Sequence, residues 1–200
     1  SEFDEQLVDR LLEESLALRS VERTVETVLL PGVQALTPGS PEYFFAWRHT
    51  SGWLAAAMRV APPATRNEGV LIFDASAPTQ IDALHVQAFE LFLRRGGLRV
   101  LCLPVELQAQ RIGNALRALR PSALVLAGAC ELEVMGRLVY AARQSTENLA
   151  IFDYRGVLGQ TGAATVGLLD PSATIAATTL RQALTGPASQ VQAIAPARAS

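Results

Sequence analysis

The feature that most constrains this fold is a regular alternation of short apolar runs with helical segments after residue 68. The run 70–73 is apolar at four successive positions, which is typical of a strand buried on both faces. The same pattern predicts five strands, at 70–73, 100–103, 124–126, 149–152 and 166–169. Helical segments are predicted between and after them, at 78–95, 106–119, 131–143 and 172–184. Because strand–helix alternation builds parallel sheets, the sequence predicts a doubly wound α/β domain.

The N-terminal third carries helix signals instead of strand signals. Leucines recur at helical spacing between residues 7 and 18 among acidic residues, which predicts an amphipathic helix. A second helix is expected over about 21–36, kinked or split at Pro31. Ser40 and Pro41 then form an N-cap and a first-turn proline for a third helix that runs to about residue 60. This helix is rich in aromatic side chains: Tyr43, Phe44, Phe45, Trp47 and Trp53.

The predicted elements divide the chain into three parts. Pro62-Pro63 marks a boundary, so we expect a helical-bundle cap over 1–65 and a sheet domain over 66–186. Residues 187–200 are mostly Ala, Pro, Ser and Gln, and we expect a flexible tail there. A helical cap before a five-stranded flavodoxin-like sheet is therefore the predicted architecture. Since the chain opens on Ser1 without a methionine, we also expect it to be a piece of a longer protein.

Composition excludes several classes of function. Half of the residues are hydrophobic and 18% are charged, which is typical of a globular protein. The net charge of −2 offers no footprint for direct DNA binding. The sequence contains no lysine, which excludes a P-loop, a Schiff base and the phosphorylation-receiver site. No apolar run approaches the roughly 18 residues of a membrane span, no signal peptide opens the chain, and the two cysteines suit a reduced, cytoplasmic protein.

Ligands of doubly wound sheets sit beyond the carboxyl ends of the strands, at the point where the strand order reverses. The turn after the first strand contains no GxGxxG, and GxSxG, HExxH and CxxC are absent from the sequence. Three carboxylates at strand ends could do acid–base work, although acids at such positions more commonly cap the next helix: Asp74, Asp153 and Asp170. The sequence therefore favours a binding or sensory module over an enzyme.

Histidines and cysteines supply the remaining candidate ligands. His85 lies about one turn into the helix after the first strand, so it is either a packed helix residue or a ligand at the binding edge. His49 lies in the aromatic helix, where the alternative is a hydrogen-bonded core or interface histidine. Cys102 is central in the second strand and is expected to face the core, which argues against a structural zinc site. Cys130 follows the third strand as a redox thiol or a small buried side chain.

Several segments resemble a known family. Residues 70–78 with the helix that follows, and residues 94–104, resemble the cobalamin-binding modules of methionine synthase and of light-sensing MerR-type regulators. Arg48-His49 falls where the caps of those regulators carry a Glu-His pair. The resemblance covers residues 25–185. It implies a helical bundle over a five-stranded sheet, as the residue pattern does independently.

The signature of that family is altered here. The family has an acidic residue, x, His, x, x, Gly after its first strand, where the histidine ligates cobalt and the glycine lets the nucleotide tail pass. Asp82 stands at the position of the cobalt histidine, and His85 at that of the glycine. Ala127-Gly128-Ala129 replaces a segment with a tail-lining serine, and the later glycine pair is not reproduced at Arg155-Gly156. We therefore expect no cobalamin with an inserted tail.

A histidine in a module without cobalamin ligands resembles the domain called "sensor containing haem instead of cobalamin" (SCHIC) of photosynthesis-gene antirepressors, and the stretch 82–89 is similar. The resemblance implies haem held by His85, with His49 as a second ligand under the aromatic helix. It also implies a partner, a PpsR-type repressor that alone contacts DNA, and a response to blue light and redox state. FAD would belong to a separate blue-light domain. The alternatives are a cobalamin-dependent sensory regulator and an unrecognised enzyme.

Overall fold

The computed structural model describes residues 4–104, 109–128, 131–146, 149–158 and 166–185. Five strands form one sheet: β1 (Gly69–Asp74), β2 (Arg99–Pro104), β3 (Ala123–Ala127), β4 (Ala150–Tyr154) and β5 (Gly167–Leu168). All neighbouring strands are parallel, in the order β2-β1-β3-β4-β5. This is the flavodoxin-like order, so the predicted fold class is confirmed.

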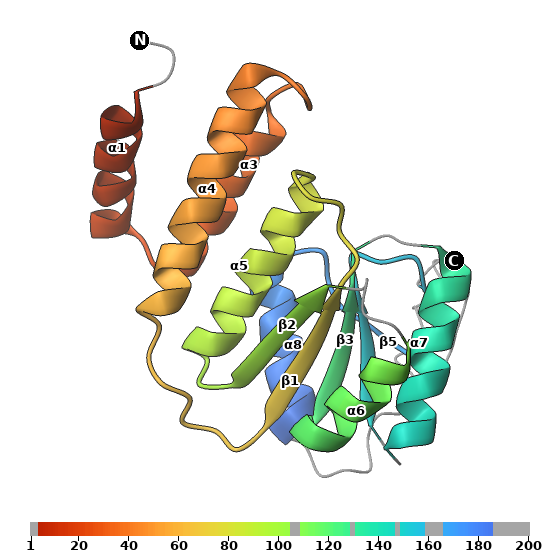
Figure 1. Cartoon of the computed structure of the whole chain (residues 1–200). Helices are drawn as coiled ribbons and strands as arrows, with labels where there is room; N and C mark the ends of the chain where they lie inside the picture. The colour runs from red at the N-terminus through yellow and green to blue at the C-terminus, as the bar shows by residue number, and fades with distance from the viewer. Residues whose placement is uncertain (1–3, 105–108, 129–130, 147–148, 159–165, 186–200) are drawn as a thin grey trace, which may run out of the picture.

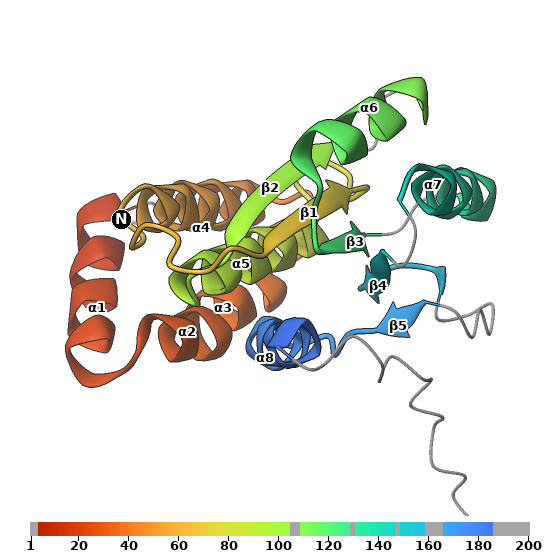
Figure 2. The ribbon, with the colours of Figure 1, turned by 90° about the horizontal axis from the view of Figure 1, so that it is seen from below.

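Helices cover both faces of the sheet (Figures 1 and 2). One face packs against α5 (Ile81–Arg95) and α8 (Ala173–Thr185), and its strand residues Val70 and Ile72 share a core with Phe89 and Leu180. The other face carries α6 (Ala109–Leu119) and α7 (Leu132–Ser145). Burial on both faces explains why β1, β3 and β4 are continuous apolar runs, whereas the edge strand β2 leaves Leu101 39% exposed.

The cap lies over α5, at the end of the molecule away from α7 (Figure 1). It consists of α1 (Glu5–Leu18), α2 (Val21–Thr24), a π-helical turn η1 (Val25–Leu29), α3 (Leu30–Gln34) and α4 (Pro41–Arg59). Leu30 and Leu54 belong to the same core cluster as the α5 side chains. Cap and sheet therefore share one hydrophobic core. No helix in the described part of the chain is long and apolar enough to cross a membrane.

The caps predicted from sequence are present. The Ser40 hydroxyl accepts a hydrogen bond from the Tyr43 amide at 3.1 Å, with Pro41 in the first turn. The kink or split expected at Pro31 appears as the π-helical turn that precedes it. Proline has no N–H to donate to the preceding turn, so the regular α-helical hydrogen bonding is interrupted there.

Some boundaries differ from the prediction. The helix after β1 begins at Ile81 and not at residue 78. A turn precedes it, in which the Gln80 amide donates to the Ala77 carbonyl at 3.1 Å and Thr79 has a left-handed φ of +67°. The strands β1, β2 and β3 each extend one residue beyond the predicted run at both ends. Strand β4 begins one residue later and ends two residues later than predicted, and β5 is one residue shorter at each end. The predicted tail 187–200 lies outside the described residues.

Candidate functional site

The candidate site lies at the carboxyl ends of β1, β3 and β4. The chain leaves β1 to form β2 on one side of it and returns to place β3 on the other side. The strand order reverses between β1 and β3, which makes this the expected ligand edge. The loops after these strands decide how much room the edge offers.

The crevice between β1 and β3 is closed by direct contact between the two loops. The Ala75 amide donates to the Ala127 carbonyl at 2.8 Å. Gly128 has a φ of +77°, and a Cβ added there would lie 2.5 Å from Ser76 Oγ and 2.6 Å from the Ser76 amide nitrogen. Gly128 is therefore required by its conformation and by the close approach of Ser76. Within the described residues, the two loops are therefore in direct contact at 75–76 and 127–128.

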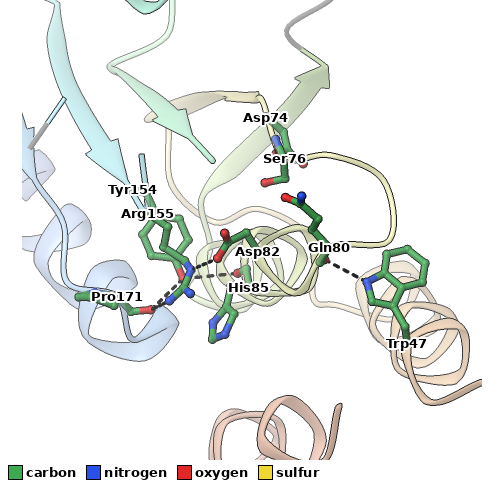
Figure 3. Close-up of polar contacts among 9 residues, drawn as sticks. All are labelled: Trp47, Asp74, Ser76, Gln80, Asp82, His85, Tyr154, Arg155 and Pro171. Carbon is green, nitrogen blue, oxygen red and sulfur yellow. Dashed lines mark hydrogen bonds and ion pairs between the residues drawn. The ribbon is translucent and has the colours of Figure 1, made fainter. Parts of the chain in front are cut away.

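Next to the closed crevice, an ion pair joins α5 to the end of β4. Arg155 Nε donates to Asp82 Oδ1 at 2.7 Å (Figure 3). Arg155 Nη1 also donates to the Pro171 carbonyl at 3.2 Å, just before α8. Arg155 has a left-handed φ of +54°, a conformation that costs free energy in a non-glycine residue and aims its side chain at Asp82. The carboxylate of Asp82 is thus paired with the guanidinium of Arg155.

His85 lies one turn further along α5, on the Arg155 side of that helix in Figure 3. Its pKa is lowered to about 4, chiefly by burial and secondarily by the positive charge of Arg155. Asp82 and Glu26 act in the opposite direction on the same ring. The imidazole is therefore neutral near pH 7. Its Nδ1 is buried and has no hydrogen-bond partner among the described residues, so the ring keeps an unused donor or acceptor.

His49 lies in a different environment. Its Nε2 is 3.0 Å from Asp9 Oδ1 on α1, and its ring stacks on Phe45 with 6.4 Å between the centroids. Its side chain is 13% exposed. The two histidines therefore have separate neighbours, and the structure does not bring His49 to His85. The expectation that His49 supplies a second ligand to the same iron is at odds with this arrangement, because α1 holds the ring instead.

Aromatic residues of α4 contact the site as hydrogen-bond donors. The Tyr43 hydroxyl donates to the Thr79 carbonyl at 2.8 Å, and Trp47 Nε1 donates to the Gln80 carbonyl at 3.0 Å. Both acceptors lie in the loop that leads into α5. The sequence predicted an apolar cover from this helix and missed these two hydrogen bonds, which we call the clamp of α4. The residue types could have indicated the clamp, since Tyr and Trp each carry a polar atom that needs a partner when buried.

A second connection from the cap also escaped sequence analysis. Glu26 of η1 accepts from the Ser172 hydroxyl at 2.6 Å and from the Thr174 amide at 3.0 Å. A carboxylate at the start of α8 satisfies a free amide and complements the helix dipole. The partners are 146 and 148 residues apart, which is why no local pattern announced them.

The carboxylates at the strand ends serve turns. Asp74 Oδ1 accepts from the Ser76 amide at 2.8 Å, and burial raises the pKa of this carboxyl. Asp170 Oδ1 accepts from the Ser172 amide at 2.8 Å. Asp153 is 4% exposed and packs beneath Gly156. Asp74 and Asp170 therefore stabilise turns and do not cap the next helix, since the N-cap of α5 is Gln80 and the Ser172 hydroxyl caps α8.

The thiol of Cys102 is not reactive in this structure. Cys102 is half-buried in β2, and burial raises the pKa of its thiol to about 12, so it stays protonated. Cys130 lies outside the described residues, so its role as a redox thiol or a small buried side chain stays a prediction. In the described ranges, no group of three or more His, Cys, Asp or Glu side chains is placed to hold a metal ion.

The residues present do not fit a cobalamin with its tail inserted. The crevice that the tail would enter is closed by Ser76 and Gly128, and Asp82 is paired with Arg155. His85 offers this edge a neutral imidazole with an unpartnered Nδ1, a donor of the kind that haem iron takes.

The fold defines a class: a helical cap on a parallel, five-stranded flavodoxin-like sheet. No protein-family model and no curated protein matches the sequence. Among solved structures, the chain is similar to a novel cobalamin-binding protein from Desulfitobacterium hafniense DCB-2. The similarity covers 92% of this chain and 94% of the other, with a TM-score of 0.46 and 12% sequence identity.

Proposed function

We propose that this chain is the sensory and protein-interaction module of a transcriptional antirepressor that binds a PpsR-type repressor. The proposal combines the sequence resemblance to SCHIC domains of AppA-type antirepressors with the ligand edge described above. The observation that carries it is His85, a neutral and half-buried histidine with an unpartnered Nδ1 beside a closed crevice. Such an edge suits a signalling module that does not bind cobalamin and uses His85 to bind a different ligand.

In this proposal haem is a reversible ligand of the module and His85 holds its iron. Haem would supply a redox-active metal, which is how redox or haem state would be sensed. Arg155 would keep the imidazole neutral through its positive charge, and its ion pair with Asp82 would fix the turn of α5 that carries His85. FAD and the response to blue light would belong to a separate domain. The proposal assigns no reaction to this chain.

Haem titration of the purified chain tests the ligand assignment. We expect a Soret band that His85→Ala abolishes or strongly shifts, because the iron loses its nitrogen ligand. His49→Ala is the matched control, since that ring is held by Asp9 and stacks on Phe45. A wild-type spectrum and affinity in the His85→Ala protein would overturn the assignment. Thermal unfolding of both variants shows whether they remain folded.

Pull-down with a purified PpsR-type repressor tests the partner. We expect this chain to retain the repressor and not to shift operator DNA by itself, because its net charge is −2. A gel shift by the chain alone at physiological salt would contradict the proposed indirect contact with DNA. Failure to retain the repressor in either haem state would overturn the proposed partner.

A further inference from the structure

Strand β2 forms one edge of the sheet. In the order β2-β1-β3-β4-β5 it pairs with β1 on one side, and no strand of the described chain pairs with it on the other (Figure 2). An edge strand presents amides and carbonyls that a strand of another molecule can join. The side chains that cover this edge therefore influence whether two molecules associate through their sheets.

The register of β2 on β1 decides which of its backbone groups point outward. The Arg99 amide donates to the Glu68 carbonyl at 3.3 Å, so the amide of Arg99 points toward β1. The direction of the backbone groups alternates from one residue to the next along a strand. The amides and carbonyls of Val100 and Cys102 therefore point to the free edge.

Arg94 already occupies one of these outward groups. Its Nη2 donates to the Val100 carbonyl at 2.8 Å, from the last turn of α5. Glu90, one turn earlier on the same helix, holds the guanidinium in place, because its Oε1 accepts from Arg94 Nε at 2.9 Å and from Nη2 at 2.7 Å. Hydrogen bonds between charged groups are stronger than neutral ones. The guanidinium is thus fixed at the edge of the sheet.

The β2 strand of a second copy fits this edge in the antiparallel direction. With Leu101 opposite the same residue of the second copy, Val100 lies opposite Cys102, and their outward amides and carbonyls can pair. Leu101 is 39% exposed, and contact with its counterpart would cover it. Arg99 then lies opposite Leu103, so no two arginines meet. This register has the two-fold symmetry that is commonest among homodimers.

We propose that Arg94 keeps the free edge of the sheet from pairing with β2 of a second copy. The pairing needs the Val100 carbonyl of each copy as the acceptor for the Cys102 amide of the other. The Arg94 guanidinium holds that acceptor in the structure. This inference is independent of the proposed function, because it uses no residue of the ligand edge.

Sedimentation and hydrogen exchange of the whole chain, measured with a reductant present, test the inference. We expect the unsubstituted chain to be a monomer in which the amides of Val100 and Cys102 exchange quickly, because they lie at an open edge. Arg94→Ala should form a reversible dimer, and dimerisation should slow the exchange of both amides at least tenfold. Arg94→Met keeps much of the side-chain stem, should behave in the same way, and replaces Arg94→Ala if that variant does not fold.

Arg137→Ala is the matched control, because Arg137 forms an i, i+4 ion pair with Glu133 on α7 and its loss changes the net charge equally. It should remain a monomer with fast exchange in β2. Leu101→Glu added to Arg94→Ala should restore the monomer, since two carboxylates would then face each other across the symmetry axis. If both Arg94 variants remain monomeric, or associate without protection of the outward β2 amides, the inference is overturned. Protection of those amides that grows with the concentration of the unsubstituted chain also overturns it.

Discussion

At the scale of single residues, the ligand edge depends on side chains whose environments differ sharply over one turn of α5. Asp82 is paired with Arg155, while His85 is buried among charges of both signs and stays neutral. Burial disfavours the charged imidazole, and Arg155 reinforces that effect. The energetic consequence of a lowered histidine pKa is a dependence of stability on pH.

The haem-free protein should lose stability as the pH falls from 6.5 toward 4. In this window the unfolded chain binds a proton at residue 85 that the folded chain does not, since the folded pKa is about 4 and the ordinary value is 6.5. The contribution of His85 to this loss is at most about 3 kcal/mol. Urea unfolding at several pH values measures it, and His85→Gln should flatten the curve. Parallel curves for the two proteins would show that His85 carries no such linkage.

Gly128→Ala should destabilise the chain by about 2–3 kcal/mol. The φ of +77° disfavours any side chain, and the new Cβ would meet Ser76. Urea unfolding at pH 7 gives the free energy. Gly136→Ala is the control, because that glycine is helical and open, and alanine there should stabilise the protein by up to about 1 kcal/mol. If both substitutions act alike, the loop contact does not constrain residue 128.

At the scale of elements, α4 is the part of the cap that contacts the loop at the ligand edge. It packs on α5 through the shared core and also holds the loop before α5 through Tyr43 and Trp47. Both acceptors in the loop are backbone carbonyls, so the contact fixes the path of the chain and not a particular side chain. A displacement of α4 would therefore move the backbone of residues 79 and 80, where α5 begins.

Tyr43→Phe and Trp47→Phe should each cost about 1 kcal/mol of unfolding free energy, the usual value for one lost hydrogen bond. Hydrogen exchange in the loop before α5 should be faster in both variants, and fastest in the double variant. Tyr140→Phe removes the hydroxyl of a residue that is 67% exposed on α7, and it should change neither quantity. Unaltered exchange at residues 79 and 80 in the double variant would mean that the clamp does not hold the loop.

At the scale of the whole molecule, several polar contacts tie the cap to the sheet domain. They include the clamp of α4 on the loop before α5, the contact of Glu26 with the start of α8, and the ion pair between Glu22 and Arg95. The core that runs beneath these contacts makes the cap and the sheet domain one packed unit.

The chain should not retain hydroxocobalamin through gel filtration. Its crevice is closed by Ser76 and Gly128, and Asp82 offers a paired carboxylate where a neutral imidazole would be needed. The double variant Asp82→His, His85→Gly restores two signature positions but leaves the contact between the loops. We expect it to remain unloaded as well. Near-stoichiometric corrin absorption in the protein fraction of the unsubstituted chain would refute the prediction.

Local patterns in the sequence were enough to determine the class of fold. Apolar runs bounded by turn residues predicted the strands, and Ser40 with Pro41 predicted the start of α4, because both depend on neighbours within a few positions. The start of α5 was placed three residues early, since the left-handed Thr79 is stabilised by Tyr43 from a distant helix. The sequence also identified His85 and Asp82 as unusual, through the altered signature.

Which side chains meet was decided by the tertiary structure alone. Arg155 reaches Asp82 across 73 positions, and Glu26 reaches Ser172 across 146. The same packing sends His49 to Asp9 and keeps it from His85. Periodicity records which face of an element is buried, but not which other element covers that face. The pairing of polar groups depends on that second fact, because only the packed core brings them within hydrogen-bond distance.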